Sequence, residues 1–303
     1  MVTDNVKVDL SGAPQTMLAT FYAKALDADL PNSILHDRWA RQIVDRIDYD
    51  WTRTTMTAGR SPAVTTRSAH FDEWTRQFLA VHPEAVVLHL GCGLDSRFFR
   101  VNPGAGVLWY DVDYPEVAAL RERLYPIPGA SAATGEAAGA SAATGDGSGA
   151  SAATGDGSAR YRLIQTSVTD PAWLAEIPAD RPVLMLGEGL TMYLTEADGM
   201  ALLRRIVDRF PCGELQFDAF NRFGIKAQWT NPVVRRAGAT LYWGINRPDE
   251  IVAAVPGVRL LAWQSPFETA GFRQVSLPLR LMARAMSALP ATKYMSQYHR
   301  YAF

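Results

Sequence analysis

The chain is short of cysteine, of net charge and of long apolar runs, and each shortage excludes a class of protein. Its 303 residues include two cysteines, Cys92 and Cys212, too few for a disulfide framework or a zinc cluster built from cysteines. We expect both to be small core residues. The 30 basic and 31 acidic side chains nearly cancel, which argues against a nucleic-acid partner. No run approaches the roughly 18 apolar residues of a membrane span.

The remaining composition is typical of a globular protein. Hydrophobic residues make up 48% of the chain, enough to bury a sizeable core. The first residues, MVTDNVKVDLSGAPQ, carry acids and lack the apolar stretch of a secretory signal. We therefore expect a cytoplasmic protein that does not associate with a membrane.

Residues 129–158 form three copies of a ten-residue unit built almost entirely from Gly, Ala, Ser and Thr. A stacked solenoid of three such turns would be marginal, because alanine is its largest apolar side chain. The composition instead predicts a flexible surface insertion. Its deletion should leave folding nearly intact, since loop-closure costs grow slowly with length.

Outside this insertion, apolar runs alternate with helical patterns. Strands are expected at 86–90, 107–112, 161–165, 183–186 and 214–217, and helices at 94–100, 115–124, 171–176 and 196–210. Apolar runs with little internal alternation, separated by helices, are typical of a parallel sheet covered on both faces. The sequence therefore predicts a doubly wound α/β core.

The flanks of this core differ in pattern. Residues 10–82 look helical, and we expect them to cover the carboxyl edge of the strands, where ligands bind in such folds. After the core we expect helices at 248–255 and 279–289 and strands at 258–263 and 272–277. Thr195, with Asp198 three positions later, predicts the start of the helix at 196–210.

The segment VVLHLGCGLDSRFFR ends a predicted strand with two glycines, Gly91 and Gly93. Glycine tolerates positive φ and lets the backbone approach a ligand closely. The third small position is Ser96, which weakens a nicotinamide-binding interpretation. Asp113 follows Gly93 by twenty residues, where an acid in this topology accepts the hydroxyls of a ribose. The alternative for Asp113 is an ordinary turn acid at the end of a strand.

Two further acids lie at expected strand ends. Asp95 follows the glycine loop, where its carboxylate could accept from an ammonium group or cap the next helix. Glu188 follows the fourth strand in LMLGEGLTMYL; its alternative is a carboxylate held by turn amides. A ligand with a ribose, an amino group and a carboxylate would suit these acids, and S-adenosylmethionine is such a ligand. Its sulfonium chemistry requires no metal, and we predict none.

Several motifs in order carry a family resemblance: LSGAPQTMLATFYAKAL, TTRSAHFDEW, VVLHLGCGLDSRFFR, WYDVDYPEV, LGEGLTMYL and HRYAF. With them the chain resembles the leucine carboxyl methyltransferase group of class I methyltransferases, in particular bacterial polyketide O-methyltransferases. The resemblance implies a Rossmann-like, mostly parallel seven-stranded sheet in one methyltransferase domain, 1–303. Within it, 1–82 would be the helical cap, 83–128 and 160–303 the cofactor-binding core, and 129–159 the insertion.

The resemblance also implies roles for single residues. Arg67 would grip the cofactor carboxylate, a task that suits a guanidinium fork. Gly91 and Gly93 would line the methionine moiety and Asp113 would hold the ribose. Glu188 would lie near the amino group or the acceptor.

The resemblance places Tyr193 close to Glu188; the catalytic residue stays unknown, with Glu188 and Tyr193 as the candidates. At the adenine, relatives often use an Asp-Leu pair after the third strand. Here Ser167 and Val168 take these positions, so the charged contact is missing.

The acceptor is expected to be a small, polyketide-like molecule with a carboxylate or hydroxyl group. A carboxylate is ionised near neutrality and requires no base, whereas an alcohol or phenol requires one. We assign no catalytic role to His36, His70 or His89, and expect His89 to be a satisfied core histidine. Two alternatives stay open: a non-catalytic ligand-binding module of the same fold, and a nicotinamide oxidoreductase.

Overall fold

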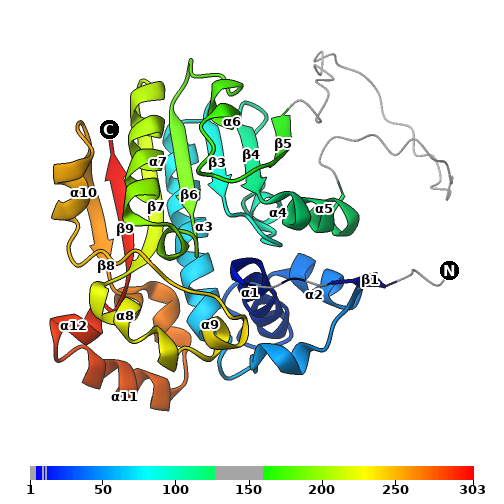
Figure 1. Cartoon of the computed structure of the whole chain (residues 1–303). Coiled ribbons are helices and arrows are strands. Elements are labelled where there is room, and N and C mark those ends of the chain that lie inside the picture. The colour runs from blue at the N-terminus through cyan, green and yellow to red at the C-terminus, as the bar shows by residue number, and fades with distance from the viewer. Residues whose placement is uncertain (1–4, 9, 11, 127–159) are drawn as a thin grey trace, which may run out of the picture.

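The computed structural model describes residues 5–8, 10, 12–126 and 160–303. The predicted insertion lies outside these residues, and the division into cap, core and insertion stays a prediction. A seven-stranded sheet in the order β5-β4-β3-β6-β7-β9-β8 forms the centre (Figure 1). Its strands are β3 (Val86–Leu90), β4 (Leu108–Asp113), β5 (Tyr161–Gln165), β6 (Val183–Gly187), β7 (Gly213–Phe220), β8 (Arg259–Gln264) and β9 (Ser296–Ala302).

Strands β3, β4, β5, β6 and β7 are parallel to one another, and β9 runs antiparallel between β7 and β8. The predicted doubly wound, mostly parallel sheet of seven strands is therefore confirmed. The chain winds from β3 through β4 to β5 in one direction and continues with β6 on the other side of β3. Ligands of open α/β sheets bind at this switch point, beyond the carboxyl ends of the strands.

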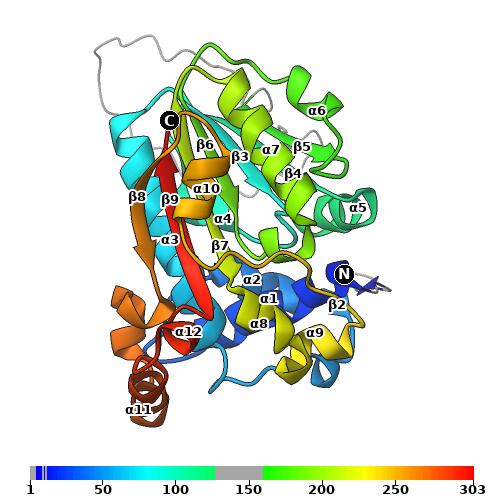
Figure 2. The ribbon, with the colours of Figure 1, turned by 60° about the vertical axis from the view of Figure 1, so that its left-hand side comes forward.

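Helices cover both faces of the sheet (Figure 2). On one face lie α3 (Pro62–Val81), α4 (Arg97–Val101) and α5 (Pro115–Leu124), and on the other lie α6 (Ala172–Ala175), α7 (Glu196–Arg209) and α10 (Asp249–Ala254). Successive strand residues point to opposite faces: Val87 packs with Phe78 of α3, whereas Val86 packs in the cluster of α7. Both faces are thus buried, which explains the nearly continuous apolar runs.

Two local features hold helix α7 in place: an N-cap at its first turn and close packing at a glycine. The Thr195 side chain accepts from the backbone N–H of Asp198 at 3.1 Å, as predicted. Further along, a Cβ added to Gly199 would lie 2.1 Å from the ring of Trp243, so the indole fills the space that glycine leaves. The Tyr242 N–H donates to the Met192 carbonyl at 2.8 Å, which ties this segment to the loop after β6.

The N-terminal helices α1 (Ala13–Ala28) and α2 (Arg38–Val44) lie at the carboxyl ends of β3 and β4 (Figure 1). With them are β1 (Val6–Lys7), β2 (Ile47–Asp48) and η1 (Trp51–Thr54). Their predicted place over the edge of the sheet is confirmed. Helix α3 differs, because its apolar stripe of Phe71, Trp74 and Phe78 packs along the sheet face.

The C-terminal part contains two departures from the sequence prediction. The strand expected at 272–277 is wrong: Ala270–Gln274 is the 3-10 helix η6, and α11 (Leu277–Met286) begins directly afterwards. Pro278 lies in the first turn of α11, where its missing N–H costs nothing. Strand β9 was not predicted, because its sequence SQYHRYA is neither an apolar run nor an apolar-polar alternation, although most of its residues are buried. The remaining short elements are η3 (Thr191–Tyr193), α8 (Arg222–Lys226), η4 (Gln228–Thr230), α9 (Pro232–Arg236), η5 (Pro266–Glu268) and α12 (Pro290–Lys293).

Over the ranges 12–126 and 160–303, no helix has the length and apolar character needed to cross a bilayer.

Candidate active site

The glycine loop and the acid of the next strand meet at the carboxyl edge of the sheet. Gly91 and Gly93 have φ values of 62° and 52°, a backbone region that favours glycine. The Gly93 N–H donates to Oδ2 of Asp113 at 2.7 Å, and the Tyr114 N–H donates to Oδ1 at 2.8 Å. Burial raises the pKa of Asp113, and the hydrogen bond from Gly93 opposes this shift.

Side chains from two other elements close over this loop. A Cβ on Gly93 would lie 2.8 Å from Cγ of Met17 in α1, and one on Gly91 would lie 3.2 Å from Cδ1 of Leu190. Gly93 is therefore required by space as well as by backbone angle, whereas at Gly91 the backbone angle is the stronger requirement, since Leu190 would have to shift only slightly. The cap and the loop after β6 form the walls around the bare backbone.

Asp95 points into an ion-pair network below α1. Its carboxylate pairs with Lys24 at 2.9 Å, with Arg100 at 2.7 Å and with Arg97 at 3.4 Å. The ammonium group that it contacts belongs to Lys24, and its predicted contact with the ammonium of a ligand stays a prediction. Asp95 does not cap α4, whose N-cap residue is Ser96.

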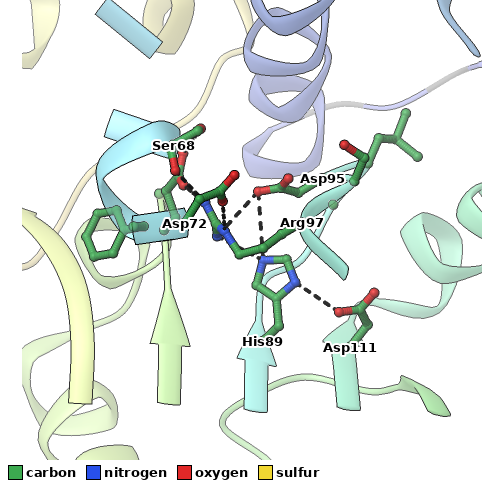
Figure 3. Close-up of polar contacts among 12 residues, drawn as sticks. Ser68, Asp72, His89, Asp95, Arg97 and Asp111 are labelled. Carbon is green, nitrogen blue, oxygen red and sulfur yellow. Dashed lines mark hydrogen bonds and ion pairs between the residues drawn. The ribbon is translucent and has the colours of Figure 1, made fainter. Parts of the chain in front are cut away.

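Arg97 is the centre of this network (Figure 3), where Ser68, Asp72 and Asp95 surround its guanidinium. Its side chain is fully buried, pairs with Asp72 at 2.7 Å and also contacts Glu188. Desolvation opposes the charge, but Asp95 and the other carboxylates hold the pKa of Arg97 above its usual range. The network joins the cap, α3 and the glycine loop through ion pairs.

Arg67 and Glu188 form an ion pair with each other. Nε of Arg67 donates to Oε1 of Glu188 at 3.0 Å, and the Ser68 hydroxyl donates to the same oxygen at 2.7 Å. Burial disfavours the charge of Glu188, yet Arg97, Lys24 and Arg67 hold the pKa of its carboxyl below the usual range. Glu188 is therefore a stable anion.

Tyr193, Ser167 and Val168 surround the same edge from other elements. The Tyr193 hydroxyl donates to Oγ1 of Thr16 in α1 at 3.0 Å, and burial raises its pKa. The Ser167 hydroxyl lies 2.8 Å from that of Thr169. Val168 packs in the core of the sheet, so its backbone, and not its side chain, is available to a ligand.

The histidines take structural places. His89 is buried and its Nδ1 lies 2.9 Å from Oδ1 of Asp111, which confirms it as a satisfied core histidine. His70 lies on α3, where burial first and Arg300 second lower its pKa to about 4. His36 falls in the stretch 10–82 that the sequence predicts to be helical, but it lies in the turn before α2 with a φ of 55°. That expectation was wrong, because Asp37 caps α2 one residue later.

Five site residues escaped the sequence analysis: Lys24, Ser68, Asp72, Arg97 and Asp218. Asp218 carried a usable signal, since it is an acid within the apolar strand QFDAF. The others lie in helices, where charged residues are usually exposed. Within the described ranges, no group of three or more His, Cys, Asp or Glu side chains is arranged to hold a metal ion.

Comparisons with known proteins agree with this geometry. The family model for leucine carboxyl methyltransferase matches residues 16–207. The tetracenomycin polyketide synthesis O-methyltransferase TcmP of Streptomyces glaucescens is 37% identical over 296 residues, covering 98% of each chain. The S-adenosyl-L-methionine-dependent methyltransferase dpfgK of Gibberella zeae is 36% identical, covering 84% of this chain and 83% of the relative.

Solved structures share the fold. A methyltransferase candidate from Thermobifida fusca YX aligns with a TM-score of 0.53 at 15% identity, covering 92% of this chain and 93% of that one. A DUF574-family protein from Streptomyces avermitilis aligns with a TM-score of 0.51 at 11% identity, covering 92% and 96%. These likenesses concern the fold alone.

The sheet order, the glycine loop and the strand-end carboxylate define a class I methyltransferase. Within that class, the chain belongs to the leucine carboxyl methyltransferase family. It is an enzyme of methyl transfer, which decides against the nicotinamide oxidoreductase and the non-catalytic module that the sequence left open.

Proposed function

We propose that this enzyme transfers a methyl group from S-adenosylmethionine to a carboxylate of a small, polyketide-like molecule. The observation that carries the proposal is the 2.7 Å contact between the Gly93 N–H and the Asp113 carboxylate at the switch point of the sheet. Two relatives, one a polyketide O-methyltransferase and one dependent on S-adenosylmethionine, support the acceptor class and the donor.

The residues at this edge fit the donor. Each carboxylate oxygen of Asp113 accepts one backbone hydrogen bond and keeps a lone pair for a ribose hydroxyl. The guanidinium of Arg67 suits the donor's carboxylate, and the anionic Glu188 suits its ammonium group. Ser167 offers a hydroxyl toward the adenine. These assignments to the donor are part of the proposal.

Bound S-adenosylmethionine supplies a methyl group on a sulfonium, which an acceptor oxygen attacks in line. The chain's contribution is alignment and the exclusion of water. Asp113 and Arg67 would fix the two ends of the donor, and Met17 and Leu190 would line the space between them. Tyr193, held by Thr16 of the cap, would bound the acceptor side.

The titratable groups favour a carboxylate acceptor over a hydroxyl. His89 is committed to Asp111, and His70 packs edge-on against Trp74 with ring centroids 4.2 Å apart. Glu188 is ion-paired with Arg67. His89 and Glu188 thus have charged partners, whereas Nε2 of His70 is buried without a hydrogen-bond partner among the described residues and burial lowers the pKa of this ring to about 4, which makes it a weak base. An acceptor that is already ionised requires none.

Isothermal titration with S-adenosylhomocysteine tests the donor site. Asp113→Ala should weaken binding by about 1 to 3 kcal/mol, because the ribose hydroxyls and the Gly93 N–H lose their partner. Asp208→Ala, an exposed acid on α7, is the matched control and should bind as the wild type does. Unchanged affinity in Asp113→Ala would remove this residue from the site.

The acceptor is tested separately by the pH profile of kcat/KM. With a small aromatic acid as acceptor, the profile should be flat from about pH 6 to 8, since the carboxylate is ionised throughout. A tenfold rise per pH unit, together with methyl ether products identified by mass spectrometry, would show a hydroxyl acceptor instead.

A further inference from the structure

Asp218 is a buried carboxylate that the proposed donor contacts do not use. Its side chain is 1% exposed, and its backbone is in register with Tyr298 of β9. The ladder between β6 and β7 ends at the pair Gly187 and Phe217. Asp218 is thus the first residue of β7 beyond this ladder, beside the loop that follows β6.

The two carboxylate oxygens of Asp218 hold two different structures. Oδ2 accepts from Nη1 of Arg67 at 2.7 Å, and Oδ1 accepts from the Gly189 N–H at 2.6 Å. The backbone carbonyl of Asp218 accepts from the Thr191 hydroxyl at 2.6 Å. One residue therefore joins α3, through Arg67, to the loop that carries Glu188.

Arg67 is held on two sides by carboxylates. Glu188 accepts from Nε at 3.0 Å and Asp218 accepts from Nη1 at 2.7 Å, so the plane of the guanidinium is fixed. Nη2 has no acceptor within hydrogen-bond distance in the part of the chain that the structure describes. The side chain stays 17% exposed, so the guanidinium keeps donors for a ligand.

The loop runs close to this free nitrogen. Gly189 has a φ of 70°, and a Cβ built on it would lie 3.6 Å from Nη2 of Arg67. The bond from the Gly189 N–H to Asp218 keeps the loop in this place. Asp218 thereby orients the guanidinium of Arg67 and fixes the position of the Gly189 backbone beside Nη2.

We propose that Asp218 is a positioning residue for the methyl donor: it aims the free N–H groups of Arg67 at the donor's α-carboxylate and holds the Gly189 loop beside them. The inference rests on the proposed function, in which Arg67 binds that carboxylate. Asp218 itself does not touch the donor. Its loss should therefore affect ligands with an amino-acid tail and spare ligands without one.

The test compares two ligands by isothermal titration. S-adenosylhomocysteine carries the α-carboxylate, and 5′-methylthioadenosine carries the same adenosine and sulfur without it. Asp218→Asn keeps the size of the side chain and removes its charge. We expect the Kd for S-adenosylhomocysteine to rise about tenfold and the Kd for 5′-methylthioadenosine to stay within about twofold. The ratio of the two values does not depend on the fraction of folded protein.

Variants of Arg67 separate this inference from the proposed function. Arg67→Gln should lose the same selectivity, and Asp218→Asn added to Arg67→Gln should cost nothing more, because both act through one guanidinium. If Arg67→Gln keeps wild-type selectivity, the proposed role of Arg67 fails. If Arg67→Gln loses it and Asp218→Asn does not, only the positioning role fails.

A merely structural Asp218 gives a different pattern. Both ligands would then weaken together, and the double variant would show additive losses, which would overturn the inference. Asp218→Glu keeps the charge but moves it by one methylene group. It should give a selectivity between those of the wild type and Asp218→Asn, and wild-type selectivity in all Asp218 variants would also overturn the inference.

Discussion

The two faces of the sheet, covered by α3 and by α7, differ in the kind of side chain that they bury. Beside α7 the buried side chains are apolar, as with Ile206 and Phe217, both fully buried. Between α3, α4 and the cap, the buried side chains include a cluster of charged groups, among them Arg97 and Asp72. Apolar packing tolerates partial loss, whereas a buried ion pair offsets its desolvation only when every partner is present. The charged side should therefore be the more sensitive one.

The largest expected effect comes from breaking the charged side at its centre. Arg97→Met keeps much of the side-chain volume but leaves Asp72, Asp95 and Glu188 without their shared cation. We expect a loss of about 3 to 5 kcal/mol in the free energy of unfolding, measured by urea denaturation. Arg162→Met is the control, since the Arg162 pair with Glu176 is exposed and such pairs contribute about 0 to 1 kcal/mol.

The matched change on the apolar side is Ile206→Ala. It removes a fully buried side chain from the cluster of α7 and should cost about 2 to 4 kcal/mol in the same assay. The loss should not depend on salt or on pH between 5 and 8, because no charge is involved. A strong dependence on either would contradict the division between the two sides.

Acid should weaken the charged side selectively. Desolvation opposes the charge of Asp111, but Arg121 lowers its pKa to about 2, and Arg100 and Arg97 lower the pKa of Asp72. A lowered folded-state pKa gives stability that is present above the unfolded value, near 4, and is lost as pH falls through the folded value. For Asp111 this amounts to about 2 kcal/mol.

The measurement is the free energy of unfolding between about pH 5 and pH 2. Burial raises the pKa values of Asp113 and Asp218, so protonation of these two carboxyls offsets part of the loss of stability in acid. We expect the loss to dominate, because the network contains more carboxylates. The wild type and Ile206→Ala should give parallel curves. A curve that stays level below pH 4 would show that the network contributes nothing.

The smallest effect is expected at the start of α7, on the apolar side. Thr195→Ala removes the side chain that accepts from the Asp198 N–H, and a lost N-cap costs about 1 kcal/mol. Thr195→Ser keeps the hydroxyl and should restore most of this stability. Equal losses in both variants would assign the effect to packing and not to the cap.

Apolar elements could be predicted from the sequence, whereas the buried charges could not. The predicted first and last residues of β3, β5 and α5 agree with the structure. Apolar runs and a proline at a helix start are local signals, so they can be recognised in the sequence. The sequence also predicted that Gly93 and Asp113 lie together, because an acid twenty residues after the glycine loop falls at the end of the neighbouring strand in this topology. Arg97 and Asp72 were not, since a charged residue in a helix looks the same whether it is exposed or buried in a network. Strand β9 was missed because its neighbours lie far away in the sequence.

The contact between Gly199 and Trp243 ties two positions on separate segments to each other. Because a Cβ at 199 would lie 2.1 Å from the indole, a larger residue there is compatible only with a smaller one at 243. These two positions should therefore change together among homologous chains. The Tyr242 N–H donates to the carbonyl of Met192, one residue before Tyr193. A substitution at both 199 and 243 would therefore change the surface beside the proposed acceptor. Such an exchange would change the proposed acceptor side and leave the residues proposed to hold the methyl donor as they are.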